Sequence, residues 1–455
     1  MVKIYTKHFK LLMDICTLYS PDLTRFLKKI PILKRFCKKK KLIQISDDYY
    51  TTFKKAHEYK NNGINARHLL KLINYRFKKN RVRSYLLGNE WWRSFLEASS
   101  CKDEGDNFTL SPLIENTRKL DYNLLEAYEW LHIYASLMRV GLFYPAYYIR
   151  ELAVKKAIDK LYSEEASDSD IKMGISAIID TGDIETARKW IHDKQQIQYF
   201  ENFTSNCSFL IKILSNQDKS EFYYNNPGDN EYFNFINNKQ VAIVGPAQSD
   251  IKNAPEIDSF DRVVRFNYWK SGVGCDSVYK GNKTNISYFN LEQGKYLLNK
   301  CNLINLKELE WFVFKSREHA HFFSQKQISD NVKCRFFKQV NNAIFNGTLN
   351  AIPNAIIDLL KFHPKKIKVF NADLMLTVKR VKDYNPQEFN LNSKIEMIER
   401  FCRASISHDP VAQYNVLNIL WKQKLIEGDT RFNEVMQIGA KDYMKQLQNI
   451  YGGYV

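Results

Sequence analysis

The chain has 455 residues, too many for one compact core, and its length predicts about two or three domains. Its hydrophobic content of 44% and aromatic content of 14% exclude a largely disordered protein. The net charge of +18 predicts attraction to an anionic partner, but charge alone does not choose among nucleic acid, an acidic membrane surface and a phosphorylated or carboxylated substrate.

The cysteines and the hydropathy pattern favour a cytoplasmic chain. None of the eight cysteines forms a CxxC pair, which argues against a zinc site and for a reduced compartment. We predict neither a signal peptide nor a membrane span, because the N-terminus lacks a sustained apolar core and no run of about 18 apolar residues occurs. A basic patch near the N-terminus is either a solvated face or a peripheral contact with an anionic inner membrane. It comprises Lys34, Arg35, Lys38, Lys39, Lys40 and Lys41.

Residues 1–225 are predicted to form an all-helical domain. Apolar residues recur every three or four positions in LDYNLLEAYEWLHIYASLMRVGLF and YYIRELAVKKAIDKLY. Further on, Gly182 is placed to end one helix and Asp183 to cap the next, as in a helical-repeat pair, although no fixed period supports a solenoid. Asp168 and Asp170 resemble the DxD that binds metal in many nucleotide-sugar enzymes, but their place before a helix favours capping.

A turn-rich stretch over residues 226–238 predicts a linker, and residues 239–455 have a different pattern. Short apolar runs (QVAIVG, ISYF, WFVF and IKVFNA) alternate there with helical stretches such as LNAIPNAIIDLLKFH. Strands that alternate with helices predict an α/β domain with a mostly parallel sheet, covered on both faces.

The segment VAIVGPAQSD is a predicted strand that runs into Gly245. In open α/β folds the ligand crevice lies outside the carboxyl ends of the strands, where a loop can offer backbone N–H groups to phosphate. The segment is neither a GxGxxG dinucleotide motif nor a GK[ST] phosphate loop, so a plain turn is the alternative. The candidate ligand residues in this loop are Gly245, Pro246, Ala247 and Gln248.

EIDSFDRVVRFN, followed by GNKT, closely resembles the large sialyl motif of the family 29 sialyltransferases, including their bacterial sialyltransferase-like branch. The matching residues are Glu256, Ile257, Asp258, Ser259, Asp261, Val264, Arg265, Asn267, Gly281, Lys283 and Thr284. The resemblance implies that Asn267 contacts the phosphate or ribose of a CMP-sugar donor and that Thr284 belongs to the same site. Asp258, Asp261 and Arg265 are expected to be structural. One departure is Pro246, where the family has an asparagine, so donor binding would pass to Ala247 or Gln248.

Residues 346–376 resemble the small sialyl motif, in which small polar residues begin a helix and bind the CMP phosphate and base. A helix N-terminus suits this role because its N–H groups and dipole favour an anion. The candidates are Asn346, Gly347, Thr348 and Asn350, with Asn371 and Asp373 at the end of the next strand. An ordinary strand–helix–strand unit is the alternative.

SHDPVAQ resembles the last motif of the family, His-x4-Glu, with His408 as the catalytic base and Gln413 in place of the glutamate. A histidine is a natural base near neutral pH, although a capping or surface role is the alternative. His319 and His321 lack a third ligand at a suitable spacing, so we predict no metal site.

The resemblance covers about residues 238–430. It implies a Rossmann-like, sialyltransferase-like variant of the GT-A fold and an inverting, metal-independent glycosyltransferase without a cofactor. The donor would be a CMP-activated acidic sugar, sialic acid or Kdo, and the acceptor a glycan or glycolipid of bacterial capsule or lipopolysaccharide; no nucleic-acid partner is expected. The alternatives are a transferase that uses a UDP-sugar, and a helical-repeat interaction protein with a degenerate transferase domain.

Overall fold

The computed structural model describes residues 90–100, 110–194, 200–217, 226, 228–267, 277–290, 309–324, 333–378 and 394–452. The chain divides into two compact units, Met1–Lys78 and Lys79–Val455, and every described residue belongs to the second. The basic patch predicted between residues 34 and 41 lies outside the described residues.

The second unit contains a parallel sheet of seven strands in the order β5-β4-β3-β2-β1-β6-β7. All six strand pairs are parallel, which confirms the predicted parallel α/β sheet. From β1 the chain adds strands in one direction as far as β5 and then returns to place β6 on the other side of β1. The strands are β1 (Gln240–Val244), β2 (Arg262–Phe266), β3 (Ile286–Phe289), β4 (Trp311–Phe314), β5 (Lys333–Phe336), β6 (Lys366–Phe370) and β7 (Glu427–Gly428).

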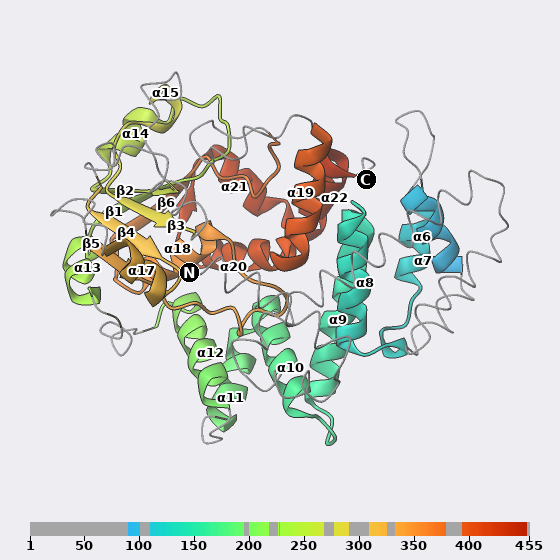
Figure 1. Cartoon of the computed structure of the whole chain (residues 1–455). Coiled ribbons are helices and arrows are strands. Elements are labelled where there is room, and N and C mark those ends of the chain that lie inside the picture. The colour runs from blue at the N-terminus through green and yellow to red at the C-terminus, as the bar shows by residue number, and fades with distance from the viewer. Residues whose placement is uncertain are drawn as a thin grey trace, which may run out of the picture. The chain divides into compact units, whose positions relative to one another are not determined.

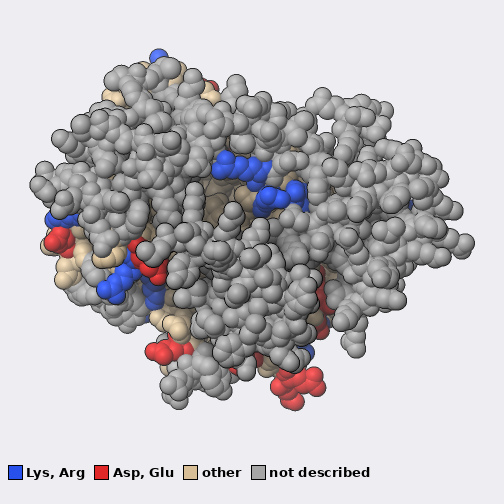
Figure 2. All heavy atoms as spheres, in the orientation of Figure 1, with Lys and Arg blue, Asp and Glu red and all other residues tan. Residues whose placement is uncertain are grey.

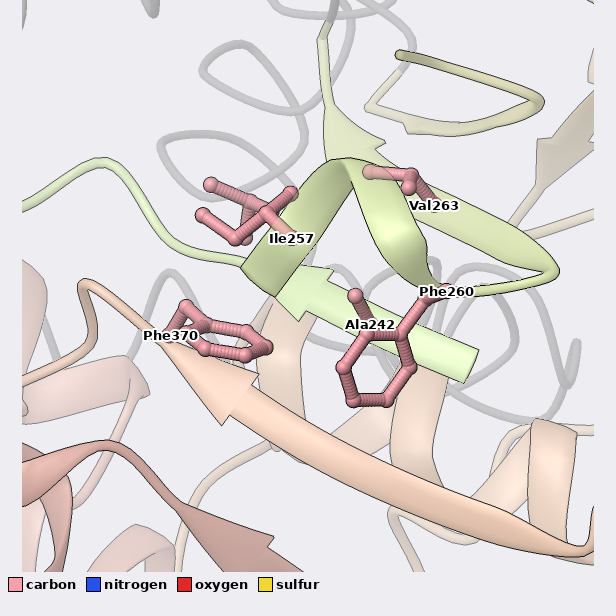
Figure 3. Close-up of a cluster of buried hydrophobic side chains, with 6 residues drawn as sticks. Ala242, Ile257, Phe260, Val263 and Phe370 are labelled. Atoms are coloured by element: carbon pink, nitrogen blue, oxygen red, sulfur yellow. The ribbon is translucent and has the colours of Figure 1, made fainter. Parts of the chain in front are cut away.

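Short helices connect successive strands from β1 to β5, and right-handed connections in one direction along the sheet put such helices on one face. These are α14 (Ala254–Ser259), α15 (Ser277–Lys280) and α17 (Arg317–Ser324). Ile257 of α14 packs with Ala242 and Val263 of β1 and β2, and the ring of Phe260 meets that of Phe370 edge to face, with the centroids 5.7 Å apart (Figure 3). Burial of this apolar cluster attaches α14 directly above the end of β1.

The opposite face carries α13 (Asp229–Ile236) and α18 (Ala351–Leu360). Arg335 of β5 is fully buried there and pairs with Asp229 of α13 and Asp358 of α18. A right-handed return from β5 to β6 requires α18 on this face, opposite α14. Residues 226–238 therefore differ from the predicted linker, because they include a helix whose first residue forms a buried ion pair with the sheet.

Helices that precede the sheet in sequence belong to the same compact unit (Figure 1). They are α6 (Glu90–Ser100), α7 (Ser111–Arg118), the 3-10 helix η1 (Tyr122–Leu124), α8 (Ala127–Arg139), α9 (Phe143–Leu161), α10 (Asp168–Thr181), α11 (Ile184–Lys194) and α12 (Glu201–Leu214). Gly182 ends α10 with a left-handed φ of 85°, and Asp183 caps α11, as predicted. Asp170 forms a capping box with Ser167, which confirms the capping role.

Four helices complete the unit: α19 (Lys394–Ser407), α20 (Pro410–Lys422), α21 (Thr430–Gln437) and α22 (Gly439–Tyr451). They lie between the sheet and the earlier helices: α19 packs on α8, α22 on α9, and α20 on both α10 and α18. Within the described ranges, no helix is both long enough and apolar enough to cross a membrane.

Candidate functional site

The order of strands reverses between β1 and β6, and this reversal leaves a crevice at their carboxyl ends. Gly245 follows β1 and Asn371 follows β6. The N–H of Gly245 donates to the carbonyl of Phe370 (2.8 Å), and the N–H of Ala247 donates to the carbonyl of Asn371 (3.1 Å). A Cβ at position 245 would lie 2.4 Å from the Asn371 carbonyl oxygen, so this close approach requires glycine.

A cavity of about 410 Å³ opens at this point. This volume falls within the usual range for small-molecule sites. Four of the predicted donor residues line the cavity: Ala247, Gln248, Asn371 and Asp373. Residues from α21 complete the wall, and the sequence patterns did not indicate them because they lie beyond the three motifs. They are Thr430, Arg431 and Glu434, with Ser249, Asp250, Ile251, Ala372 and Thr377 from the two loops.

A larger cavity, of about 820 Å³, lies at the opposite edge of the sheet. Its wall includes Lys365 and Lys366 before and within β6, and Lys422 and Lys424 near the end of α20. It includes none of the predicted site residues. Because parallel α/β sheets bind ligands at the carboxyl ends of their strands, we assign the candidate site to the smaller cavity.

Among the described residues that line the cavity, Asp373 has a buried polar atom without a hydrogen-bond partner. Asp373 is 3% exposed, and its Oδ1 accepts a hydrogen bond from the N–H of Met375 (3.2 Å). Oδ2 is buried and has no hydrogen-bond partner among the described residues. A buried carboxylate oxygen without a donor is costly, and in a cavity wall it is suited to accept a hydrogen bond from a ligand.

The backbone around Asp373 is held in an unusual conformation. Asn371, Leu374 and Met375 all have positive φ values (51°, 53° and 79°). The hydroxyl of Tyr443 donates to the carbonyl of Leu374 (2.8 Å), and that of Tyr451 donates to the carbonyl of Met375 (2.7 Å). Such strain in non-glycine residues persists only where the surroundings hold it, and it is frequent at ligand sites.

Asn371 contributes to the wall, but its side chain is already engaged by the protein. Its Oδ1 accepts from Asn253 (3.3 Å), its Nδ2 donates to the Tyr279 carbonyl (3.3 Å), and its N–H donates to Asp429 (2.8 Å). Burial raises the pKa of the Asp429 carboxyl, and the nearby charge of Asp373 adds to this increase. Asn371 therefore joins β6 to α21 and shapes the cavity.

The charged residues of EIDSFDRVVRFN hold the strand edge, as expected. Asp258 accepts from the N–H groups of Asn282 and Lys283 (3.0 Å each). Arg265 donates to the Thr284 hydroxyl (2.8 Å) and to the Lys280 carbonyl (2.7 Å). Thr284, predicted as a donor residue, is buried and engaged in this way between β2 and β3.

Asn267, just after β2, uses only part of its hydrogen-bonding capacity within the described residues. Its φ is 49°, its N–H donates to the Tyr288 carbonyl (2.9 Å), and its Oδ1 accepts from the Asn290 N–H (3.0 Å). Its Nδ2 group makes no hydrogen bond within the described part of the chain. The side-chain amide thus retains two N–H donors, although Asn267 does not contribute to the described wall of the 410 Å³ cavity.

The second and third motifs meet in the structure: the loop before α18 lies against the turn between α19 and α20. The N–H and the hydroxyl of Thr348 both donate to the Ser407 carbonyl (2.9 and 3.1 Å). Gly347 has a φ of 77°, and a Cβ there would lie 2.8 Å from the same carbonyl oxygen. Gln413 donates to the Thr348 carbonyl (2.9 Å) and accepts from the Asn350 N–H (2.7 Å), so it joins loop and helix.

These contacts orient His408. Its Nδ1 lies 3.0 Å from both the hydroxyl and the carbonyl oxygen of Thr348. Because a carbonyl only accepts, the Nδ1–H tautomer fits this geometry, and in neutral His408 the basic lone pair is then on Nε2. The loop and the turn thus present an oriented imidazole at the N-terminal ends of α18 and α20.

Tyr443 contacts both the loop that carries Asp373 and the helix α20. Its side chain is fully buried, and burial raises the pKa of its hydroxyl well above the ordinary value, with further contributions from Tyr451 and from the charges of Asp373 and Asp409. Its hydroxyl donates to the carbonyl of Leu374, the residue after Asp373, and its ring stacks on that of Tyr414 in α20, with the centroids 5.1 Å apart. Tyr443 thus links the cavity wall to α20, the helix that begins just after His408.

Several backbone groups predicted to bind phosphate are already used by the protein. The N–H groups of Gly245, Ala247, Thr348 and Asn350 all donate within the chain. Pro246 has no N–H. In the loop after β1, the N–H of Gln248 bonds to none of the described residues. The structure therefore offers fewer backbone N–H groups for phosphate than the sequence predicted.

No group of three or more His, Cys, Asp or Glu residues among those described could hold a metal ion. His319 and His321 lie on α17, which packs on β4 and β5, away from the crevice between β1 and β6. Figure 2 shows Lys and Arg side chains gathered beside a hollow, near the place of α19 and α21 in Figure 1.

No protein-family model, curated protein or solved structure matches this chain.

Proposed function

We propose that this protein is an inverting, metal-independent glycosyltransferase that uses a CMP-activated acidic sugar. The observation that carries the proposal is the 410 Å³ cavity at the carboxyl ends of β1 and β6. Its wall contains a carboxylate oxygen of Asp373 that receives no hydrogen bond from any described residue. A ribose hydroxyl or an exocyclic amine can donate to that oxygen. The resemblance of EIDSFDRVVRFN to the large sialyl motif narrows the nucleotide to CMP.

The proposed arrangement is Rossmann-like, with the ligand at the point where the strand order reverses. The acidic sugar is sialic acid or Kdo, and the acceptor is a glycan or glycolipid of bacterial capsule or lipopolysaccharide. We place the enzyme in the cytoplasm, at the inner membrane where such acceptors are elongated.

In the reaction, His408 takes the proton of the acceptor hydroxyl while the oxygen attacks the anomeric carbon of the donor sugar. The bond from that carbon to the CMP phosphate oxygen breaks, and CMP leaves with the electron pair. Thr348 fixes the imidazole, so that little reorganisation is needed as the proton moves. Asn267 Nδ2, the Gln248 N–H and the positive end of α18 are the groups suited to stabilise the leaving phosphate.

The test is a thermal-unfolding comparison with CMP, UMP, GDP and NAD. We expect stabilisation by CMP alone. His408→Ala should keep this stabilisation, because His408 does not line the cavity, but should release CMP from CMP-sialic acid or CMP-Kdo about 100-fold or more slowly. Stabilisation by UMP instead would favour a UDP-sugar transferase, and no stabilisation by any nucleotide would favour an interaction protein; either result overturns the proposal.

A further inference from the structure

A buried charged network links the helices before the sheet to the turn that carries His408. Arg150 of α9 is fully buried and forms two hydrogen bonds with Asp180 of α10 (2.7 and 2.9 Å). Its Nε donates to Oδ2 of Asp409 (2.7 Å), the residue that follows His408. Arg150 therefore joins the helical part of the chain to the turn that carries His408.

Asp409 has no solvent exposure and accepts hydrogen bonds from four parts of the structure. Tyr134 of α8 donates its hydroxyl (2.6 Å), and Arg150 of α9 donates its Nε. Val411 donates its N–H in the first turn of α20 (2.9 Å), and Asn346 donates its Nδ2 from the loop before α18 (3.1 Å). One carboxylate thus fixes two earlier helices, the start of α20 and the candidate ligand loop against one another.

Stability alone does not account for this arrangement. A carboxylate needs only the N–H groups of α20 to cap that helix. Burying one arginine between two carboxylates adds a desolvation cost that ion pairing often only offsets, and apolar replacements of such pairs are frequently as stable. What the network does supply is fixed geometry, because each oxygen of Asp409 has directional partners on different elements.

The loop that Asp409 holds is the same loop that contacts the imidazole of His408. Asn346, bound to Asp409, is two residues from Thr348, which holds Nδ1 of His408. Gly347 between them approaches the Ser407 carbonyl closely. A displacement of Asp409 would therefore move the imidazole and its partner loop together.

We propose that Tyr134 and Arg150 are positioning residues for His408, and that the helices before the sheet are part of the active site. This inference rests on the proposed function. It assigns these helices a role in the reaction in addition to any role in acceptor binding or assembly.

The test uses the full-length protein and Tyr134→Phe, which removes one donor to Asp409 and keeps the shape of the ring. CMP release from CMP-sialic acid and from CMP-Kdo is measured, so that no acceptor is needed. We expect kcat to fall about 10-fold with an unchanged KM for the donor, because a small displacement of a catalytic group lowers the rate without altering the nucleotide cavity. Tyr128→Phe on the same helix is the matched control, since Tyr128 is 52% exposed and should leave kcat unchanged.

A double variant separates positioning from folding. In a His408→Ala background, Tyr134→Phe should cause no further loss, because the group that it positions is absent. An equal loss in both backgrounds, or no loss in the single variant while the wild type is active, overturns the positioning role alone. A wild type that releases no CMP from either donor overturns the proposed function, and this inference with it.

Discussion

Asp373 illustrates, at the scale of single residues, how the candidate site departs from ordinary protein interior. Its Oδ2 is buried and has no hydrogen-bond donor among the described residues, and the buried carboxyl of Asp429 lies near enough for Asp373 to raise its pKa further. A buried carboxylate oxygen that lacks a donor makes the folded state less favourable. A ligand that donates to Asp373 would relieve part of that cost.

We therefore expect Asp373→Asn to stabilise the free protein and to weaken nucleotide binding. Removing the charge should raise the free energy of unfolding by about 1 kcal/mol, and the stabilisation by CMP should be largely lost. Urea unfolding with and without CMP measures both effects. Asp250→Asn, at an exposed carboxylate of the same cavity, serves as the control and should leave the free energy of unfolding unchanged. If the Asp373→Asn protein is less stable and CMP still stabilises it fully, then Oδ2 of Asp373 supports the fold and does not bind the nucleotide.

Single residues also show what sequence patterns can predict. The roles of Asp258 and Arg265 as supports of the strand edge were predictable from their motif, and the hydrogen bonds confirm them. The hydrogen bonds from the Gly245 and Ala247 N–H groups to Phe370 of β6 and to Asn371 after it were not predictable, because they depend on which strand lies beside β1. Strand order is a property of the whole sheet and leaves no mark in the local sequence.

At the scale of elements, the candidate site depends on the loop before α18 and the turn between α19 and α20. The loop lies against the turn through backbone bonds to Ser407 and side-chain bonds from Gln413. The sequence predicted both as ligand elements through separate motifs. Their contact with each other was not predictable, because some 60 residues separate Thr348 from His408 and the local pattern contains no signal for the pairing.

Gly347→Ala tests this contact. The added methyl group would lie 2.8 Å from the Ser407 carbonyl oxygen at a residue whose φ is positive, so we expect a loss of about 2 kcal/mol or more in the free energy of unfolding, together with slower CMP release. Gly439→Ala is a matched control, because its φ is also positive (82°) but no atom of the described residues lies within 4 Å of the added methyl group. Equal losses in the two variants, measured by thermal unfolding, would mean that backbone strain alone is responsible.

At the scale of the whole molecule, the helices before the sheet and the sheet itself form one compact unit from Lys79 to Val455. The sequence predicted two domains with a boundary over residues 226–238, from a change in pattern and a turn-rich stretch. Composition could not show that an ion pair between Asp229 and Arg335 attaches α13, within this stretch, to the sheet. Nor could it show that Arg150 forms an ion pair with Asp409. Both contacts join residues that lie more than 100 positions apart.

We expect residues 79–455 to fold as a single cooperative unit, and residues 226–455 not to fold stably. The shorter fragment lacks Tyr134 and Arg150, so Asp409 would lose two of its donors and the apolar faces of α19, α20 and α22 would be exposed. Breaking a buried ion pair from one side typically costs about 3 to 5 kcal/mol. Circular dichroism during heating, with limited proteolysis, measures this. A cooperative transition in the shorter fragment would show that the sheet half is an independent domain.

The network around Asp409 also has a consequence for the order of events during folding. Its donors Tyr134 and Arg150 precede it by 275 and 259 residues, so their contacts close very long loops. Such contacts form late, because the entropy of loop closure must be met before they contribute, and because synthesis of the chain delivers Asp409 long after α8 and α9. During synthesis on a ribosome, therefore, α8 and α9 would be made long before the turn that carries His408, and the proposed site would be completed among the last steps of folding.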